Sequence, residues 1–158
     1  MLSRPLSQVL TAATVALLLM GCESNSERTS DRQTNTASAS PVTCAEPDRL
    51  GIGDLRGQAT GATLWALPFK PLPLIAGQEV KIAWRMTGSG PPQFTVTSPS
   101  GEDADVLQWG PEAHSDSTWN RPGDEWGTGF HFTHAGCWRI TVRRDNATGS
   151  VSVEVVDP

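Results

Sequence analysis

The chain of 158 residues contains no tyrosine, only three cysteines, and no hydrophobic run long enough for a stable transmembrane helix. It has no Cys-x-x-Cys pair, which disfavours the common thiol-based metal and redox sites. The nucleophile elbow Gly-x-Ser-x-Gly, the zinc motif His-Glu-x-x-His and a glycine-rich phosphate loop are missing as well. These absences disfavour the main classes of hydrolase, metalloenzyme and nucleotide-binding enzyme, so we expect a protein that is not an enzyme.

Positive charge is also scarce in the chain. There are 12 lysines and arginines against 17 aspartates and glutamates, a formal net charge of -5. The basic residues form no cluster, which disfavours a nucleic-acid partner and an electrostatic contact with anionic lipid. If the protein is held at a membrane, we expect some other group to hold it there.

The first residues have the features of a secretory signal. Arg4 supplies positive charge, and residues 9–20 form an apolar run that is too short for a stable membrane anchor. This run ends in Leu19-Met20-Gly21-Cys22, which resembles the lipobox of bacterial lipoproteins. The resemblance implies cleavage before Cys22 and a diacylglycerol on its sulfur, so that lipid attaches the mature chain to a membrane. The alternative is a plain secreted protein with a chance cysteine.

The chain divides into three parts by composition. Residues 1–21 are the expected signal peptide, and residues 22–43 are the lipidated cysteine with a linker rich in serine, threonine and other small polar residues. The linker has almost no apolar side chain to bury, so we expect a disordered tether that spans about 25 Å on average. Residues 44–158 have the length of one domain with a single core.

Two cysteines remain if Cys22 carries lipid. Both Cys44 and Cys137 then lie outside the cytoplasm, where thiols tend to oxidise, and we expect a disulfide between them. A metal or redox role for this pair is the weaker interpretation. The predicted location is the cell membrane or an outer membrane, facing the extracellular or periplasmic side.

Alternation of apolar and polar residues dominates the domain. In residues 79–86, Val80, Ile82, Trp84 and Met86 share one face, which is typical of a half-buried strand. The same period returns around residues 94–96, 130–132, 138–142 and 151–155, and turn residues rich in glycine, proline, serine and asparagine separate these segments. Short strands with such turns predict an all-β sandwich.

A resemblance makes this prediction more specific. The corner and penultimate strand of immunoglobulin-like extracellular domains, where an aromatic residue follows a glycine turn, are similar to Phe130-x-Phe132-x-x-Ala135-Gly136-Cys137-Trp138-x-Ile140-x-Val142. Trp84 resembles the core tryptophan of a central strand. The resemblance implies an immunoglobulin-like antiparallel β-sandwich of about seven strands. Because Cys137 alternates with Trp138, we expect it to point away from the core, toward the outer side or edge of a sheet.

Residues 108–129 contain three tryptophans among glycine, proline and charged residues, and no aliphatic side chain larger than alanine. We expect an aromatic-rich loop. Indole rings beside carboxylates, amides and a guanidinium are typical of protein contacts and of sugar-binding surfaces. The bland alternative is that the tryptophans fold inward as plugs, with Arg121 and Asp124 tying the loop shut. The candidate binding surface consists of Trp109, Trp119, Asn120, Arg121, Asp124, Glu125 and Trp126.

The three histidines do not predict a metal site. His131 lies between two inward phenylalanines and should point outward, His134 follows in a turn, and His114 is far away in sequence. The acidic run at residues 102–105 lacks the ligand ladder of a calcium loop. We therefore expect no metal, no cofactor and no catalytic residue.

Together these observations predict a lipid-anchored, non-catalytic binding or structural module of the cell envelope, with a membrane attachment through Cys22. The partner would be an envelope protein or a glycan. The competing hypothesis is a carbohydrate-binding accessory domain that uses the tryptophan-rich segment.

Overall fold

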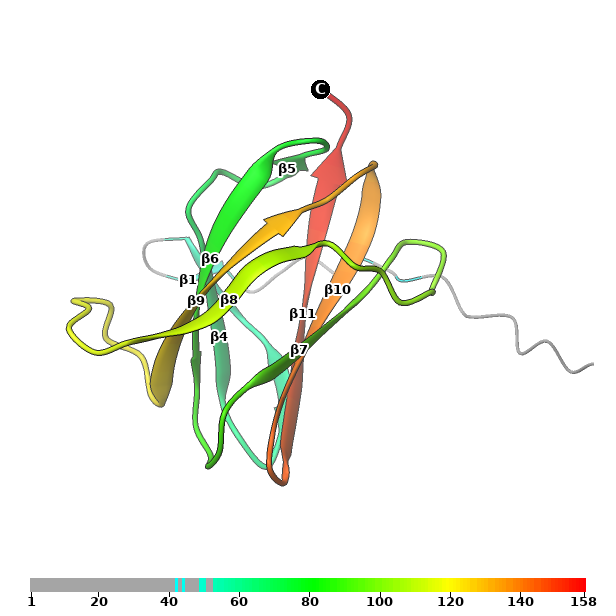
Figure 1. The fold of residues 1–158 in the computed structure, drawn as a ribbon. Coiled ribbons are helices and arrows are strands. Elements are labelled where there is room, and N and C mark those ends of the chain that lie inside the picture. Colours follow the sequence, from blue (N-terminus) through cyan, green and yellow to red (C-terminus); the bar gives the residue numbers. More distant parts are fainter. Residues whose placement is uncertain (1–41, 43, 45–48, 51–52) are drawn as a thin grey trace, which may run out of the picture. The chain divides into compact units, whose positions relative to one another are not determined.

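The computed structural model describes residues 42, 44, 49–50 and 53–158 (Figure 1). In this part of the chain every regular element is a β-strand, and no helix is long and apolar enough to cross a membrane. The expected signal peptide, lipidated Cys22 and tether fall almost wholly outside the described residues. The strands are β1 (Arg49–Leu50), β2 (Asp54–Arg56), β3 (Gln58–Thr60), β4 (Leu64–Pro68), β5 (Leu74–Ile75), β6 (Glu79–Met86), β7 (Gln93–Thr97), β8 (Leu107–His114), β9 (Asp124–His131), β10 (Gly136–Arg144) and β11 (Ala147–Val156).

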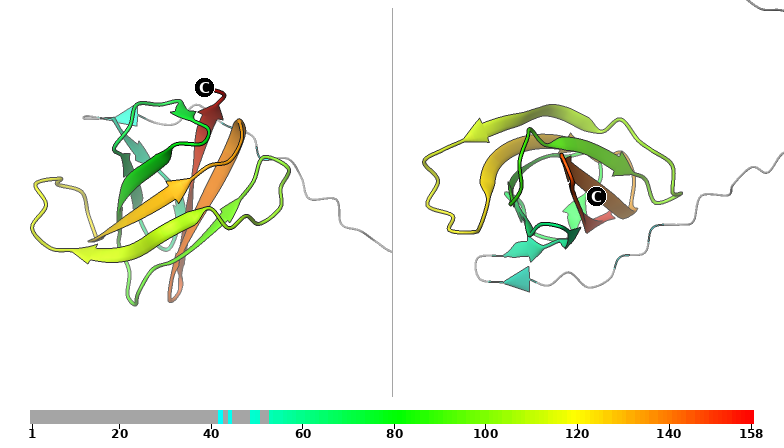
Figure 2. Two further views of the ribbon diagram at one scale, coloured as in Figure 1. Left: turned by 45° about the horizontal axis from the view of Figure 1, so that its top comes forward. Right: turned by 90° about the horizontal axis from the view of Figure 1, so that it is seen from below.

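The strands form two sheets that face each other around one core (Figure 2). The first sheet has the order β1-β2-β4-β6-β9-β8, and the second has the order β3-β11-β10-β7. All pairings within these two paths are antiparallel, and the short β5 lies parallel beside β11. The predicted antiparallel β-sandwich is confirmed, although short strands raise the number of strands above the expected seven.

The alternation in the sequence places the core side chains. Trp84 of β6 and Trp138 of β10 are both almost completely buried, as expected. Phe130 packs edge-on against Trp84 at 6.3 Å between ring centroids and stacks on Phe132 at 5.7 Å, and Phe132 reaches Trp138 at 5.3 Å. These aromatic contacts join the two sheets, because Trp84 belongs to the first and Trp138 to the second.

Trp84 and Trp138, the two tryptophans at the centre of the core, keep their indole N–H groups paired. Trp84 Nε1 donates to Thr128 Oγ1 at 2.7 Å, and Thr128 in turn donates to the carbonyl of Ile82 at 3.2 Å. Trp138 Nε1 donates to the carbonyl of His134 at 3.0 Å. An unpaired indole N–H in the core would carry a desolvation penalty of about 1–3 kcal/mol, so these partners allow tryptophan at the centre of the sandwich.

The predicted disulfide is confirmed. Cys44 and Cys137 are bonded, with their Cα atoms 5.3 Å apart and a sequence separation of 93. Cys137 alternates with the buried Trp138 and pairs across the sheet with the exposed Glu154, so it lies on the outer side of the second sheet, as expected. The disulfide therefore fastens the amino-terminal segment to this outer side.

One element differs from the sequence prediction. Residues 108–129, expected as a loop, contain most of β8 and of β9, and only residues 115–123 connect the two strands. The inward positions of β9 are Trp126, Thr128 and Phe130, while Gly127 and Gly129 alternate with them on the outer face. The two glycines were interpreted as loop residues, but here they leave room for side chains of β8 above the sheet.

Candidate functional site

Trp119 lies in the connection between β8 and β9 and folds back onto the outer face of the first sheet. It is 7% exposed and packs with Trp65 and Ala83 in a small cluster separate from the main core. Its Nε1 donates to Asp54 Oδ2 at 3.0 Å. The indole therefore has no free face for a ligand, which matches the alternative of an inward plug.

Asp54 and Arg121 close this connection. Arg121 donates through Nε to Asp54 Oδ2 at 2.5 Å and through Nη2 to Oδ1 at 3.1 Å, and its guanidinium lies 4.4 Å from the ring centre of Trp65. Asp54 is completely buried. A bidentate pair of this kind is stronger than an ordinary hydrogen bond. The expected role of Arg121 in tying the loop shut is what the structure shows, with Asp54 as the partner.

The closure depends on the charge of Asp54. Burial raises the pKa of this carboxyl, but the hydrogen bonds from Arg121 and Trp119 and the positive charge of Arg121 outweigh burial, so the pKa lies below its ordinary value of 3.8. A carboxyl with a lowered pKa in the folded state stabilises the fold above its unfolded pKa. This stabilisation is lost as the pH falls through the folded pKa.

We therefore expect the Trp119 connection to open in acid. Acrylamide quenching of Trp119, taken as the difference between the parent and Trp119→Phe, should stay low at neutral pH and rise only as the pH falls below the ordinary carboxyl pKa of 3.8 toward the lowered pKa of the folded state. In Asp54→Asn the quenching should already be high at neutral pH and change little on acidification. Equal quenching of Trp119 in parent and Asp54→Asn at neutral pH would contradict this role of the carboxylate.

Trp126 closes the opposite end of the core from the disulfide. It is 7% exposed, and the guanidinium of Arg144 lies 4.5 Å from its ring centre. Arg144, itself 4% exposed, donates to the carbonyls of Met86 and Gly90 and to Asp124 Oδ2 at 2.6 Å. Asp124 therefore ties β9 to β10, and Trp126 belongs to the core rather than to an exposed aromatic surface.

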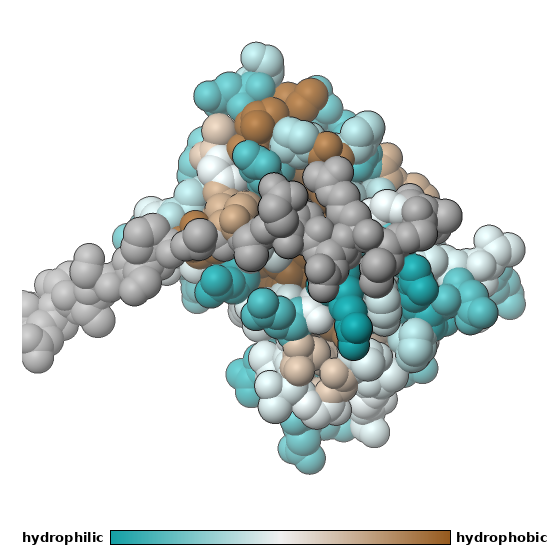
Figure 3. Space-filling view, turned by 180° about the vertical axis from the view of Figure 1, so that it is seen from behind, coloured by the Kyte–Doolittle hydropathy of each residue, from teal (hydrophilic) through white to brown (hydrophobic). Residues whose placement is uncertain are grey.

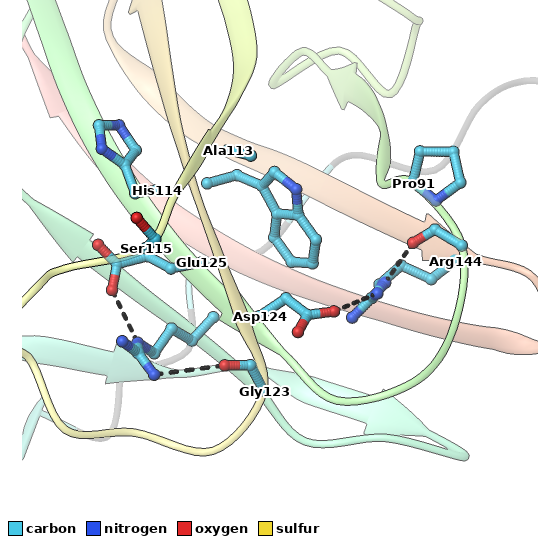
Figure 4. A pocket seen from close by; sticks show the side chains of 11 residues that line it. Pro91, Ala113, His114, Ser115, Gly123, Asp124, Glu125 and Arg144 are labelled. Carbon is cyan, nitrogen blue, oxygen red and sulfur yellow. Dashed lines mark hydrogen bonds and ion pairs between the residues drawn. The ribbon is translucent and has the colours of Figure 1, made fainter.

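An open hollow of about 680 Å³ lies beside Trp126 and Arg144. Figure 4 shows the carboxylates of Asp124 and Glu125 pointing in opposite directions, each toward an arginine. Glu125 accepts from Arg85 Nε at 2.8 Å, with the Glu125 side chain 7% exposed, whereas the Asp124 side chain is 68% exposed. The hollow, called the end groove below, is lined by Arg85, Gly90, Pro91, Ala113, His114, Ser115, Gly123, Asp124, Glu125, Trp126 and Arg144.

The end groove is mixed in chemistry. It contains two arginine–carboxylate pairs, so its fixed charges balance, and the exposed His114, Ser115 and Asp124 offer polar atoms at its surface. Pro91 is exposed, and Trp126 lines the hollow although only 7% of it is exposed. The end groove is therefore polar, balanced in charge and open to solvent.

Trp109 lies flat on the outer face of β9. It is half-buried, and its Nε1 donates to Glu79 Oε1 at 3.0 Å. A Cβ atom built on Gly129 would meet Trp109 Nε1 at 1.9 Å, so only glycine at this position permits the ring to lie there. Trp109 is the one tryptophan of the candidate set that keeps a partly open face.

Replacing Gly129 with alanine should therefore expel the ring of Trp109. We expect a red-shifted, more readily quenched tryptophan emission and a loss of stability of about 1 kcal/mol, because Trp109 loses its contact with β9 and its bond to Glu79. Gly127→Ala is the matched control, since its added methyl group would meet the outer end of the exposed His114 side chain. The same emission spectrum in both variants would show that Gly129 does not position Trp109.

The seven candidate residues thus do not form one surface. Trp119 and Arg121 lie on the outer face of the first sheet, Trp109 covers another part of that face, and Asn120 is exposed. Only three of the seven meet in one place, the end groove, namely Asp124, Glu125 and Trp126. The structure does not bring the seven residues to one surface, because Trp119 and Trp126 pack against partners from other strands.

Sequence reasoning missed the partners that hold these residues. Arg144 carried a usable signal, since it continues the inward alternation of Ile140 and Val142 and an arginine at an inward position requires an acceptor. Asp54 and Arg85 carried no such signal in the sequence, because their partners lie 67 and 40 residues away.

The three histidines lie at different places in the structure and make different contacts. His131 is half-buried at the end of β9, His114 is exposed at the end groove, and the ring of His134 packs against Trp138 at 4.8 Å. Within residues 53–158 and the few described residues before them, no group of three metal-ligating side chains comes together.

Comparison with known proteins does not assign a family. No protein-family model matches the chain, and no curated protein matches it. Among solved structures, a chain in the crystal structure of the titin M10–obscurin-like 1 Ig complex is similar at 16% sequence identity, with a TM-score of 0.35. The match covers 59% of this chain and 93% of the other. The description of the domain as an antiparallel β-sandwich rests on the two sheets themselves.

Proposed function

We propose that this protein is a lipid-anchored, non-catalytic binding module of the cell envelope. The observation that carries the proposal is the use of its three cysteines. Cys22 ends an apolar leader in a lipobox-like sequence, while Cys44 and Cys137 form a disulfide, which persists in compartments outside the cytoplasm. The export of the chain, indicated by its leader, and the oxidation of Cys44 and Cys137 are both consistent with a compartment outside the cytoplasm.

The end groove is the proposed contact site. It lies at the end of the sandwich opposite the disulfide, because its residues come from the end of β10, the start of β9 and the turn after β6. It combines the exposed carboxylate of Asp124 with the exposed ring of Pro91 and the polar side chains of His114 and Ser115. These features support an envelope protein as the partner, since protein interfaces have polar rims that combine charged, polar and apolar side chains.

The carbohydrate alternative required exposed indole rings, and most of the candidate tryptophans are buried. Sugar stacking requires an open aromatic face, yet Trp119 and Trp126 are each 7% exposed. Trp109 alone of the candidate tryptophans keeps a partly open face. An envelope protein is therefore the proposed partner.

The anchor is tested by replacing Cys22 with serine in the full chain. We expect the parent to partition into the detergent phase of Triton X-114 and the C22S variant to move to the aqueous phase or to retain its leader. A thioether-linked lipid with several buried methylenes, each worth about 0.8 kcal/mol, explains the size of this change. Cys44→Ala/Cys137→Ala is the control, which should still partition into detergent. Detergent partitioning of the C22S variant with its leader removed would contradict the anchor.

The contact site is tested by photocrosslinking in intact cells. A photoreactive amino acid at the groove residue Ser115 should give a discrete crosslinked product, whereas the same group at Thr60 on the outer face of the second sheet should not. Both positions are exposed, so neither replacement disturbs the core. Products of equal yield from both positions, or from Thr60 alone, would contradict a contact through the end groove.

A further inference from the structure

Two large apolar side chains stand out on the surface of the described part of the chain. Phe69 is 60% exposed and Ile75 is 38% exposed, and both lie in the segment that connects β4 to β6. Lys70 follows Phe69 directly, and the ammonium of Lys81 lies 5.2 Å from the centre of the Phe69 ring. Phe69 is therefore an exposed aromatic side chain flanked by lysines, and Ile75 is a second exposed apolar side chain of the same connection.

The backbone holds these side chains outward. Phe69 N donates to the carbonyl of Lys81 at 2.9 Å, and β5, which contains Ile75, pairs with β11. Pro71 and Pro73 restrict the intervening chain, and Leu72 between them packs against the core. The exposure of Phe69 and Ile75 therefore belongs to an ordered connection whose other apolar residues, Leu72, Leu74 and Ala76, pack in or against the core.

This connection lies at the same end of the sandwich as the disulfide. Val155 of β11 pairs with Leu74 on one side and with Gly136 on the other, and Cys137 follows Gly136. Neighbouring strands are about 4.8 Å apart, so Ile75 and Cys137 lie within a few strand widths of one another. In the view from behind, hydrophobic residues gather at this upper end, where β5 lies in Figure 1 (Figure 3).

We propose that this end of the sandwich, with Phe69 and Ile75, rests on the lipid bilayer that holds the lipid of Cys22. The inference rests on the proposed lipid anchor. Only 21 residues separate Cys22 from Cys44, and Cys44 is bonded to Cys137 at this end. With the coil dimensions predicted from composition, about 25 Å on average, the proposed anchor would keep the disulfide end of the domain close to the bilayer for much of the time.

The chemistry of this surface fits an interfacial contact. A phenylalanine and an isoleucine can enter the boundary between headgroups and acyl chains, while Lys70 and Lys81 keep their ammonium groups at headgroup level. Two apolar side chains are too few to bind a membrane alone, so the contact orients a domain that the lipid already holds. The end groove, at the opposite end, then faces away from the membrane.

The test uses the full lipidated protein in vesicles of phosphatidylethanolamine and phosphatidylglycerol. An environment-sensitive NBD label is placed on Phe69→Cys, or on Asn146→Cys in the hairpin between β10 and β11 at the opposite end as control. Both positions are exposed, and lipidation of Cys22 and the disulfide leave the introduced thiol for labelling. We expect the label at position 69 to gain at least about twofold in emission on reconstitution and to be quenched by doxyl lipid.

The label at position 146 should keep its emission and be quenched by aqueous iodide instead. Protein that floats with the vesicles but shows the same iodide quenching at positions 69 and 146 would overturn the bilayer contact and leave the lipid anchor intact. Protein that fails to float with the vesicles would overturn both the anchor and the contact. These outcomes separate the two proposals in one preparation.

Discussion

Removing the Cys44–Cys137 disulfide, with both cysteines replaced by alanine, is expected to lower the free energy of unfolding by about 2–5 kcal/mol. The two cysteines are 93 residues apart, so the bond closes a loop that includes most of the domain. A crosslink over such a long loop restricts the unfolded chain strongly, and this effect is the main source of the expected loss in the chain-entropy description. A loss of this size is a large part of the stability of a domain of this length.

Urea denaturation followed by tryptophan fluorescence measures this loss. The comparison uses chains that start at residue 22 and carry Cys22→Ala, so that lipid does not interfere. The parent unfolded in reducing agent is the control, and its midpoint should fall to that of the double alanine variant. A double variant with the same midpoint and slope as the oxidised parent would contradict a stabilising role for the disulfide.

Replacing Arg144 with alanine should destabilise the sandwich by about 3 kcal/mol, because one buried and one partly buried acceptor lose their donor. These acceptors are the carbonyls of Met86 and Gly90, which Arg144 reaches at 2.6 and 2.8 Å. The guanidinium also packs on the ring of Trp126, so the variant opens the end of the core. The pair with Asp124 adds less, since the Asp124 side chain is largely exposed to solvent.

Arg143 provides a matched control one position earlier in β10. Its side chain is exposed, and Arg143→Ala should change stability by no more than about 0.5 kcal/mol. Thermal unfolding of both variants by circular dichroism gives the comparison directly. Equal unfolding temperatures for the two variants would contradict the account of Arg144 as the group that closes this end.

The strand pattern was predictable because each core strand alternates apolar and polar residues locally. Residues 79–86, 138–142 and 151–155 show this alternation in the sequence, and all of them lie in strands with the expected inward faces. Trp126 was predictable by the same rule, since it lies two and four positions before Thr128 and Phe130 on the same face. The intervening Gly127 and Gly129 concealed it, because glycine in sequence usually indicates a turn.

Trp119 shows why its own burial and the end groove could not be predicted from the sequence. Its burial depends on Asp54, which is 65 residues earlier in the chain, and on Arg121, which closes over Trp65. Nothing local to residues 115–123 distinguishes an indole that packs on the outer face of a sheet from one that meets a ligand. The end groove is unpredictable for the same reason, since its lining comes from four separate segments of the chain.

The two ends of the sandwich thus differ in chemistry and in proposed role. The end with the disulfide carries Phe69 and Ile75 and is assigned to the membrane, while the opposite end carries the end groove and is assigned to a protein partner. In this proposal the β-sandwich separates the anchor from the contact site, and the expected tether would limit how far the domain travels from the bilayer.

The central claim, a lipid-anchored module, is tested most directly by intact mass spectrometry of the protein purified from bacterial membranes. The account predicts a chain that begins at Cys22, carries a diacylglycerol on that cysteine, and has lost two hydrogens through the Cys44–Cys137 disulfide. A chain cleaved at another residue, or one that begins at Cys22 with a free thiol, would contradict it.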